Sequence, residues 1–261
     1  MHLKSALAGT LFAAGYVALT AHAATSTTMG VAPSYSEGDY GASSTTKIEY
    51  VPVYLKYQVD DLSLKITVPY ISVESTGAVV SGGMVLGRPG TGGKTTTATT
   101  TESGLGDIWL EGRYRLHGTG SAPDILPYAK IKLGTASHSN GLGTGETDFE
   151  GGVGLEWMAG TKIFPFVDVG YRMIGQPSGV TYRDIATYDA GAMTKLDSKD
   201  FLTGMFAGHQ SAVAGQADAA DLIVAWNHSL NPTTGLQAFF DKGLGNGSPN
   251  YAVGAGVETR F

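Results

Sequence analysis

Apolar and polar residues alternate along much of the chain after residue 24. In 107–116, Ile108, Leu110 and Tyr114 share one face, whereas Glu111 and Arg113 share the other. A period of two places successive side chains on opposite faces of a β-strand. No convincing apolar stripe with a period of 3.6 residues occurs after residue 24. The pattern therefore predicts an all-β, antiparallel protein.

Turn residues divide the alternating region into about twelve strands, and a barrel of ten strands is the alternative. Short turns near 59–61, 118–123, 159–161, 197–198 and 231–232 alternate with longer loops rich in Gly, Thr and Ser, near 38–44, 75–103, 135–146, 175–183, 212–217 and 243–249. Short turns at one end and long loops at the other are typical of a transmembrane outer-membrane β-barrel. The predicted strands are 26–37, 45–58, 61–74, 104–117, 124–134, 147–159, 162–174, 184–195, 199–211, 218–230, 233–242 and 250–261.

Aromatic residues bracket some of the apolar faces. Phe149 and Trp157 share a face eight residues apart. At about 3.3 Å per residue and a tilt of about 40°, they span about 20 Å, close to the apolar band of a barrel. Tyr251 and Phe261 bracket the last strand similarly. A soluble β-sandwich also shows a period of two, but the loop asymmetry and the terminal Phe261 favour the barrel.

The N-terminal residues have the features of an export signal. A short basic start ending at Lys4 precedes an apolar run over 6–19, and Ala21 and Ala23 form an A-x-A cleavage pattern. Residues 1–23 are therefore predicted to be a secretory signal peptide. An N-terminal membrane anchor is the alternative, although the apolar run is short for a span. Residues 24–261 then form a single barrel domain with long extracellular loops.

Composition excludes several classes of protein. Glycine makes up 38 of 261 residues, and charged residues are only 15 %. Cysteine is absent, which excludes disulfide scaffolds and thiolate metal sites. The formal charge of −6 argues against nucleic acid as a partner.

Short motifs in a fixed order resemble a known family. The pieces are SEGDYG at 36–41, VPY at 68–70, GLGD at 104–107, KIKLGT at 130–135, GLGTGE at 141–146, GYR at 170–172 and GLGNGSP at 243–249. In these pieces the chain resembles the Gram-negative outer-membrane proteins called "meta-pathway of phenol degradation" proteins, or simply transporters. The resemblance implies an outer-membrane β-barrel that passes small compounds, aromatic ones among them. It also implies that the barrel-assembly machinery reads the C-terminal Phe261.

Charged residues fall on the polar faces of the predicted strands. An Arg or Lys facing lipid at mid-depth costs about 2–4 kcal/mol, so these faces are expected to point into the barrel. The lumen is then either a polar pathway that selects a solute by charge and size or an ion-pair ladder that stiffens a closed barrel. Glycines on these faces, such as Gly152 and Gly170, are expected to leave open space. The predicted pore-lining residues are Asp107, Glu111, Arg113, Arg115, Lys130, Lys132, Asp148, Glu150, Glu156, Asp168, Arg172 and Glu258.

Enzymatic and cofactor sites are not expected. Gly92–Thr95 evokes a phosphate loop, but Arg88 stands where the earlier glycine belongs. The loop 75–103 is read as either a solvated outer loop or an inward gate. His138 and Ser139 faintly resemble a phospholipase cluster, yet adjacent residues on a strand point oppositely. His209 and Ser211 share a face without a following Asn, and the scattered histidines lack metal-ligand spacing.

The predicted function is that of an outer-membrane channel in a Gram-negative cell, for passive or facilitated diffusion of small solutes through a narrow lumen of mixed charge. A plugged structural or surface-interaction barrel is one alternative, and a membrane hydrolase is the other. The expected partners are outer-membrane lipid, a small-molecule solute and, through Phe261, the barrel-assembly machinery. We expect no cofactor, no metal and no nucleic acid.

Overall fold

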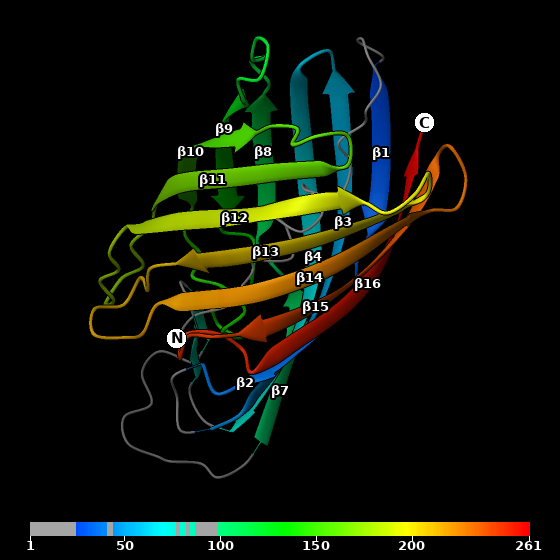
Figure 1. Cartoon of the computed structure of the whole chain (residues 1–261). Coiled ribbons are helices and arrows are strands. Elements are labelled where there is room, and N and C mark those ends of the chain that lie inside the picture. Colours follow the sequence, from blue (N-terminus) through cyan, green and yellow to red (C-terminus); the bar gives the residue numbers. More distant parts are fainter. Residues whose placement is uncertain (1–24, 41–43, 77–78, 82–83, 87–98) are drawn as a thin grey trace.

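The computed structural model describes residues 25–40, 44–76, 79–81, 84–86 and 99–261. The predicted signal peptide, 1–23, lies outside these residues. No helix within them is long and apolar enough to cross a membrane. The described chain folds into a closed antiparallel β-barrel (Figure 1).

Fourteen strands form the barrel wall, and two of its twelve positions are each shared by two strands. β1 and β2 occupy one position, and β7 and β8 occupy another. A separate hairpin, β5 (Val79–Ser81) with β6 (Met84–Leu86), lies within the predicted loop 75–103. The wall strands are β1 (Ser26–Val31), β2 (Ser34–Gly38), β3 (Thr46–Val59), β4 (Leu62–Thr76), β7 (Thr99–Leu105), β8 (Ile108–Tyr114), β9 (Asp124–Leu133), β10 (Asp148–Glu156), β11 (Ile163–Met173), β12 (Ile185–Lys195), β13 (Asp200–His209), β14 (Ala219–Ser229), β15 (Thr234–Gly243) and β16 (Tyr251–Arg260).

The barrel closes between its first and last strands. β1 pairs with β3 on one side and with β16 on the other, where Thr28 stands opposite Arg260. Phe261 continues this seam, because its N–H donates to the carbonyl of Thr27 at 2.8 Å. The prediction of twelve strands is confirmed, and the ten-strand alternative is wrong.

Two predicted strands are interrupted for identifiable reasons. The strand 26–37 divides at Ala32 and Pro33, since proline has no N–H to donate to a sheet. The strand 104–117 starts earlier, at Thr99, and divides at Gly106 and Asp107. The predicted loop 75–103 is shorter at both ends, because β4 and β7 continue their pairing to Thr76 and Thr99.

The connections alternate in length largely as predicted. Short turns join β3 to β4, β10 to β11, β12 to β13 and β14 to β15 at the same end of the barrel as the β8–β9 connection, which at 115–123 is longer than predicted and exceeds the connections after β2 and β15. Longer connections join the other neighbours and lie at the opposite end of the barrel, towards the lower left in Figure 1. We call these the short-turn end and the long-loop end.

Side chains alternate between an apolar outer face and a mixed inner face. Tyr114, Phe149, Val169 and Tyr171 are each about half exposed, although they are large and apolar. Their neighbours in sequence, such as Arg113, are mostly covered by protein. Because the period is two, the sequence assigned the two faces of these strands correctly.

The inward glycines do not leave open space. A Cβ at Gly152 or Gly170 would overlap the Tyr128 ring, and one at Gly154 would overlap Asp168. The prediction that these glycines open the lumen is wrong. They accommodate large side chains that come from neighbouring strands.

Candidate functional site

A row of charged residues runs across six neighbouring strands of the barrel wall. Each member stands directly opposite the next in the antiparallel ladder. Signs alternate along most of the row, and the exception is its first pair. The row consists of Lys56 on β3, Lys65 on β4, Glu111 on β8, Lys130 on β9, Glu150 on β10 and Arg172 on β11.

Glu150 is the most heavily paired member of this row. Arg172 Nη2 lies 2.6 Å from Glu150 Oε2, and Lys130 Nζ lies 3.4 Å from Glu150 Oε1. The Glu150 side chain is only 1 % exposed. The two cations therefore offset the free-energy cost of burying its negative charge. Opposite charges facing each other across strands stabilise the sheet.

One ion pair crosses the interior of the barrel. Arg113 Nη1 on β8 donates to Asp168 Oδ1 on β11 at 2.7 Å. Because β9 and β10 stand between these strands in the wall, the two side chains can meet only across the inside. The Arg113 guanidinium also lies 4.7 Å from the centre of the Tyr128 ring, and Lys130 Nζ lies 4.9 Å from the same ring. Tyr128 therefore has two cations against its ring.

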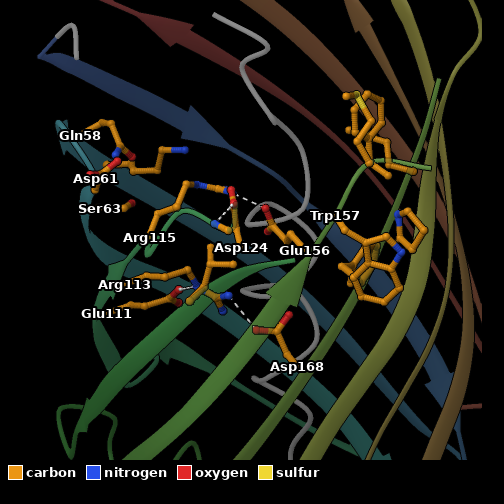
Figure 2. Close-up of a pocket in the computed structure, with 18 of the residues that line it drawn as sticks. Gln58, Asp61, Ser63, Glu111, Arg113, Arg115, Asp124, Glu156, Trp157 and Asp168 are labelled. Carbon is orange, nitrogen blue, oxygen red and sulfur yellow. Dashed lines mark hydrogen bonds and ion pairs between the residues drawn. The ribbon is translucent and has the colours of Figure 1, made fainter. Parts of the chain in front are cut away.

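Arg115 makes a second cluster nearer the short-turn end. It donates to Asp124 and to Glu156, both at 2.7 Å. Figure 2 shows Arg115 with these two carboxylates, and Arg113 with Asp168, reaching into the same space.

A third cluster is buried beneath the long loop 134–147. Lys132 Nζ lies 2.9 Å from Asp148 and 3.4 Å from Asp107, and Lys132 is only 1 % exposed. The Ala136 N–H donates to Asp107, and Lys132 donates to the Thr144 hydroxyl. These contacts attach the loop to the barrel wall.

Two cavities lie inside the barrel. The larger, of about 380 Å³, is at the short-turn end, where turn residues such as Asp61 and Met158 contribute to its wall. The smaller, of about 40 Å³, lies deeper. Arg113, Asp168 and Met205 line both, so the Arg113–Asp168 ion pair lies at the boundary between the cavities.

The predicted pore-lining residues divide into two groups. Nine of the twelve line one or both cavities. The other three, Asp107, Lys132 and Asp148, form the buried cluster beneath loop 134–147 and line neither cavity. The nine are Glu111, Arg113, Arg115, Lys130, Glu150, Glu156, Asp168, Arg172 and Glu258.

The charge pattern of the sequence did not reveal an apolar sector of the inner wall. Phe164, Phe166, Met193 and Met205, on β11 to β13, all line the larger cavity and are almost fully buried. Phe166 and Met205 also pack with Ile223 in a core cluster. Both faces of these strands carry apolar residues, so alternation of polarity is weak there. Short runs of consecutive apolar residues, such as 163–167, were the available signal.

His138 and His209, the two histidines considered for hydrolase chemistry, each contact a main-chain carbonyl. His138 Nδ1 lies 3.3 Å from the Gly143 carbonyl, and Ser139 Oγ lies 3.1 Å from Ser137 Oγ. His209 Nδ1 lies 2.9 Å from the Gln210 carbonyl, whereas the Ser211 hydroxyl donates to Val213. Within the described ranges, no three His, Asp or Glu side chains gather in a way that could hold a metal ion.

Comparison with known proteins identifies structural relatives only. No family model and no curated protein matches the sequence. The COG4313 outer membrane channel from Pseudomonas putida F1 matches with a TM-score of 0.69 at 15 % identity, covering 94 % of this chain and 99 % of that one. The translocator domain of the autotransporter NalP from Neisseria meningitidis gives 0.58 at 10 % identity, covering 98 % and 95 %. The NanC porin gives 0.54 at 11 % identity, covering 88 % and 98 %. The chain is thus similar in fold to outer-membrane barrels.

Proposed function

We propose that this protein is an outer-membrane channel through which small solutes diffuse passively, along the inside of the barrel. The observation that carries the proposal is the 380 Å³ cavity inside a closed β-wall, lined by charges of both signs. A closed barrel leaves no unpaired strand edge, and its apolar outer face suits contact with lipid. Channel and porin relatives of the same fold support this function.

The lumen would select solutes at the Arg113–Asp168 ion pair. Both residues line both cavities, so a solute that moves between the cavities at this point passes beside the pair. A passing solute disturbs the contact between these two opposite charges. Small solutes whose own polar groups can replace that contact are therefore favoured. Aromatic compounds are the class that the resemblance to the phenol meta-pathway proteins suggests, and membership in that family is part of the proposal.

The proposal also includes how the protein reaches its membrane. Residues 1–23 would direct export and be removed. Phe261 would be read by the barrel-assembly machinery, and its side chain is 76 % exposed at the seam of the barrel. Outer-membrane lipid would surround the apolar outer face.

A plugged barrel is the second candidate, and one observation favours it. Loops at the long-loop end pack into buried clusters, one around Lys132 and one around Ile174, Tyr182, Ile185 and Ala212. In this alternative the interior serves stability and the loops serve surface contacts.

Single-channel recording separates the two candidates. The refolded protein is first checked by its heat-dependent gel mobility and then inserted in a planar bilayer. Small, steady, ion-selective current steps are expected of the channel. A folded barrel that inserts and passes no current would indicate the plugged barrel instead.

A further inference from the structure

Two lysines face each other where the charge row begins. Lys56 on β3 stands directly opposite Lys65 on β4, and both line the larger cavity. Like charges directly opposite each other destabilise a strand pair. Elsewhere in the row, each cation stands opposite an acid. The Lys56–Lys65 pair therefore concentrates positive charge on one part of the cavity wall.

The acids of this cavity are already engaged with other groups. Asp168 accepts from Arg113, and Asp124 and Glu156 accept from Arg115. Glu111 lies 3.7 Å from Arg113, Asp61 is paired with His117, and Glu258 accepts from the Tyr54 hydroxyl.

Lys56, unlike these acids, is not engaged with another side chain among the described residues. It makes no hydrogen bond or ion pair with any residue in the described part of the chain, and Glu258 and Glu111 attract it only from beyond ion-pair distance. Lys65 Nζ lies 5.0 Å from the centre of the Tyr54 ring. A half-buried ammonium group at a cavity wall, beside a second ammonium group, is suited to an anion.

The wall opposite the lysines is apolar. β12 stands six strands from β3 around the twelve-position wall, and β13 stands six strands from β4. These strands carry Met193 and Met205, which line the same cavity together with Phe164 and Phe166 of β11. A volume of about 380 Å³ is in the range of small-molecule sites. The cavity thus presents cations on one side and aromatic and thioether groups on the other.

We propose that this cavity binds a small aromatic monocarboxylate. Its carboxylate lies between Lys56 and Lys65, and its ring lies against Phe164, Phe166, Met193 and Met205. The carboxylate accepts charge-assisted hydrogen bonds and relieves the repulsion between the lysines. This inference rests on the proposed function, for which it names the class of solute.

Equilibrium binding to the refolded full-length chain in micelles tests the inference without requiring passage. Benzoate, benzyl alcohol and benzylamine are titrated calorimetrically, with empty micelles as the blank. Benzoate should bind about tenfold more tightly than benzyl alcohol, since only benzoate pairs with the lysines. Benzylamine should bind most weakly.

Substitutions locate the site. Lys56→Gln and Lys65→Gln should each weaken benzoate binding about tenfold and change the affinity for benzyl alcohol by less than about twofold. Lys56→Arg should retain most of the affinity for benzoate. Lys47→Gln is the matched control, because Lys47 is also on β3 but is exposed and paired with Glu74 outside both cavities. Heat-dependent gel mobility confirms that each variant is folded. If Lys56→Gln does not fold, Lys65→Gln and Lys56→Arg carry the test.

Three results would overturn the inference: absence of benzoate binding, tighter binding of benzylamine than of benzoate, or unchanged benzoate affinity in folded lysine variants. Failure of the proposed function gives a different result. A barrel that binds benzoate through Lys56 but passes no current would contradict the channel and leave the binding site standing.

Discussion

Arg113 on β8 donates to Asp168 on β11 at 2.7 Å across the inside of the barrel, although two strands separate them in the wall. Both side chains are largely covered, at 16 % and 15 % exposure. Both residues line both cavities inside the barrel, so the pair lies at the boundary between the cavities. A contact that links distant strands can stiffen the barrel and narrow a passage at the same time.

Removing positive charge from the lumen should change ion selectivity. The larger cavity is lined by four Lys or Arg and six Asp or Glu side chains, so Arg113→Gln with Arg115→Gln leaves two against six. The more negative lumen should favour cations, and the cation-to-anion permeability ratio should rise severalfold. Reversal potentials in a salt gradient measure this ratio.

The matched control removes two exposed charges outside the cavities, Lys47→Gln with Lys242→Gln. It should leave the ratio unchanged. Equal ratios in the wild type and the Arg113/Arg115 variant would mean that these side chains do not line the path of the ions.

The Tyr128 ring requires glycine on the next two strands. Gly152→Ala should destabilise the protein by about 1–3 kcal/mol, because a Cβ there overlaps the ring and the Val169 carbonyl. Gly151→Ala, one residue away, is the control, since nothing lies within 4 Å of its Cβ. Equilibrium unfolding in lipid vesicles gives both free energies. Equal stability of the two variants would show that Tyr128 can move aside without cost.

The buried cluster around Lys132 should be sensitive to the loss of its cation. Lys132→Met leaves Asp107 and Asp148 without their cation in a covered site, at a cost of about 3–5 kcal/mol. Lys47→Met removes an exposed ion pair with Glu74 and should cost less than about 1 kcal/mol. The same unfolding measurement compares them. A cost of less than about 1 kcal/mol for Lys132→Met would contradict the structural importance of the cluster.

The turn between β12 and β13 should give a pH-dependent contribution to stability. Backbone N–H groups of Lys199 and Asp200 donate to the Asp197 carboxylate, which holds the pKa of this carboxyl below its usual value. A lowered pKa in the folded state stabilises the protein above the ordinary aspartate pKa of about 3.9, and this stabilisation is lost as the pH falls further.

The expected observation is a difference in unfolding midpoint between wild type and Asp197→Ala at neutral pH that shrinks below about pH 4. A difference that stays constant down to about pH 2 would show that the two hydrogen bonds do not favour the charged carboxylate.

Strand positions and faces could be predicted from the sequence because both follow from a period of two. The prediction that Gly152 and Gly170 open the lumen failed for a different reason. Tyr128, which covers both, comes from β9, and only the register between strands places its ring there. Register also decides that Lys56 faces Lys65 rather than an acid. Alternation within one strand carries no information about these neighbours.

Block of current by modification of one residue inside the barrel tests the central claim most directly. The chain has no cysteine, so a single introduced thiol is the only one. Met205→Cys places it where both cavities meet, and Phe206→Cys places it one residue away on the outer face. A charged methanethiosulfonate reagent should reduce the current of Met205→Cys and leave that of Phe206→Cys unchanged. Current steps that persist in full in labelled Met205→Cys would contradict a path through the lumen.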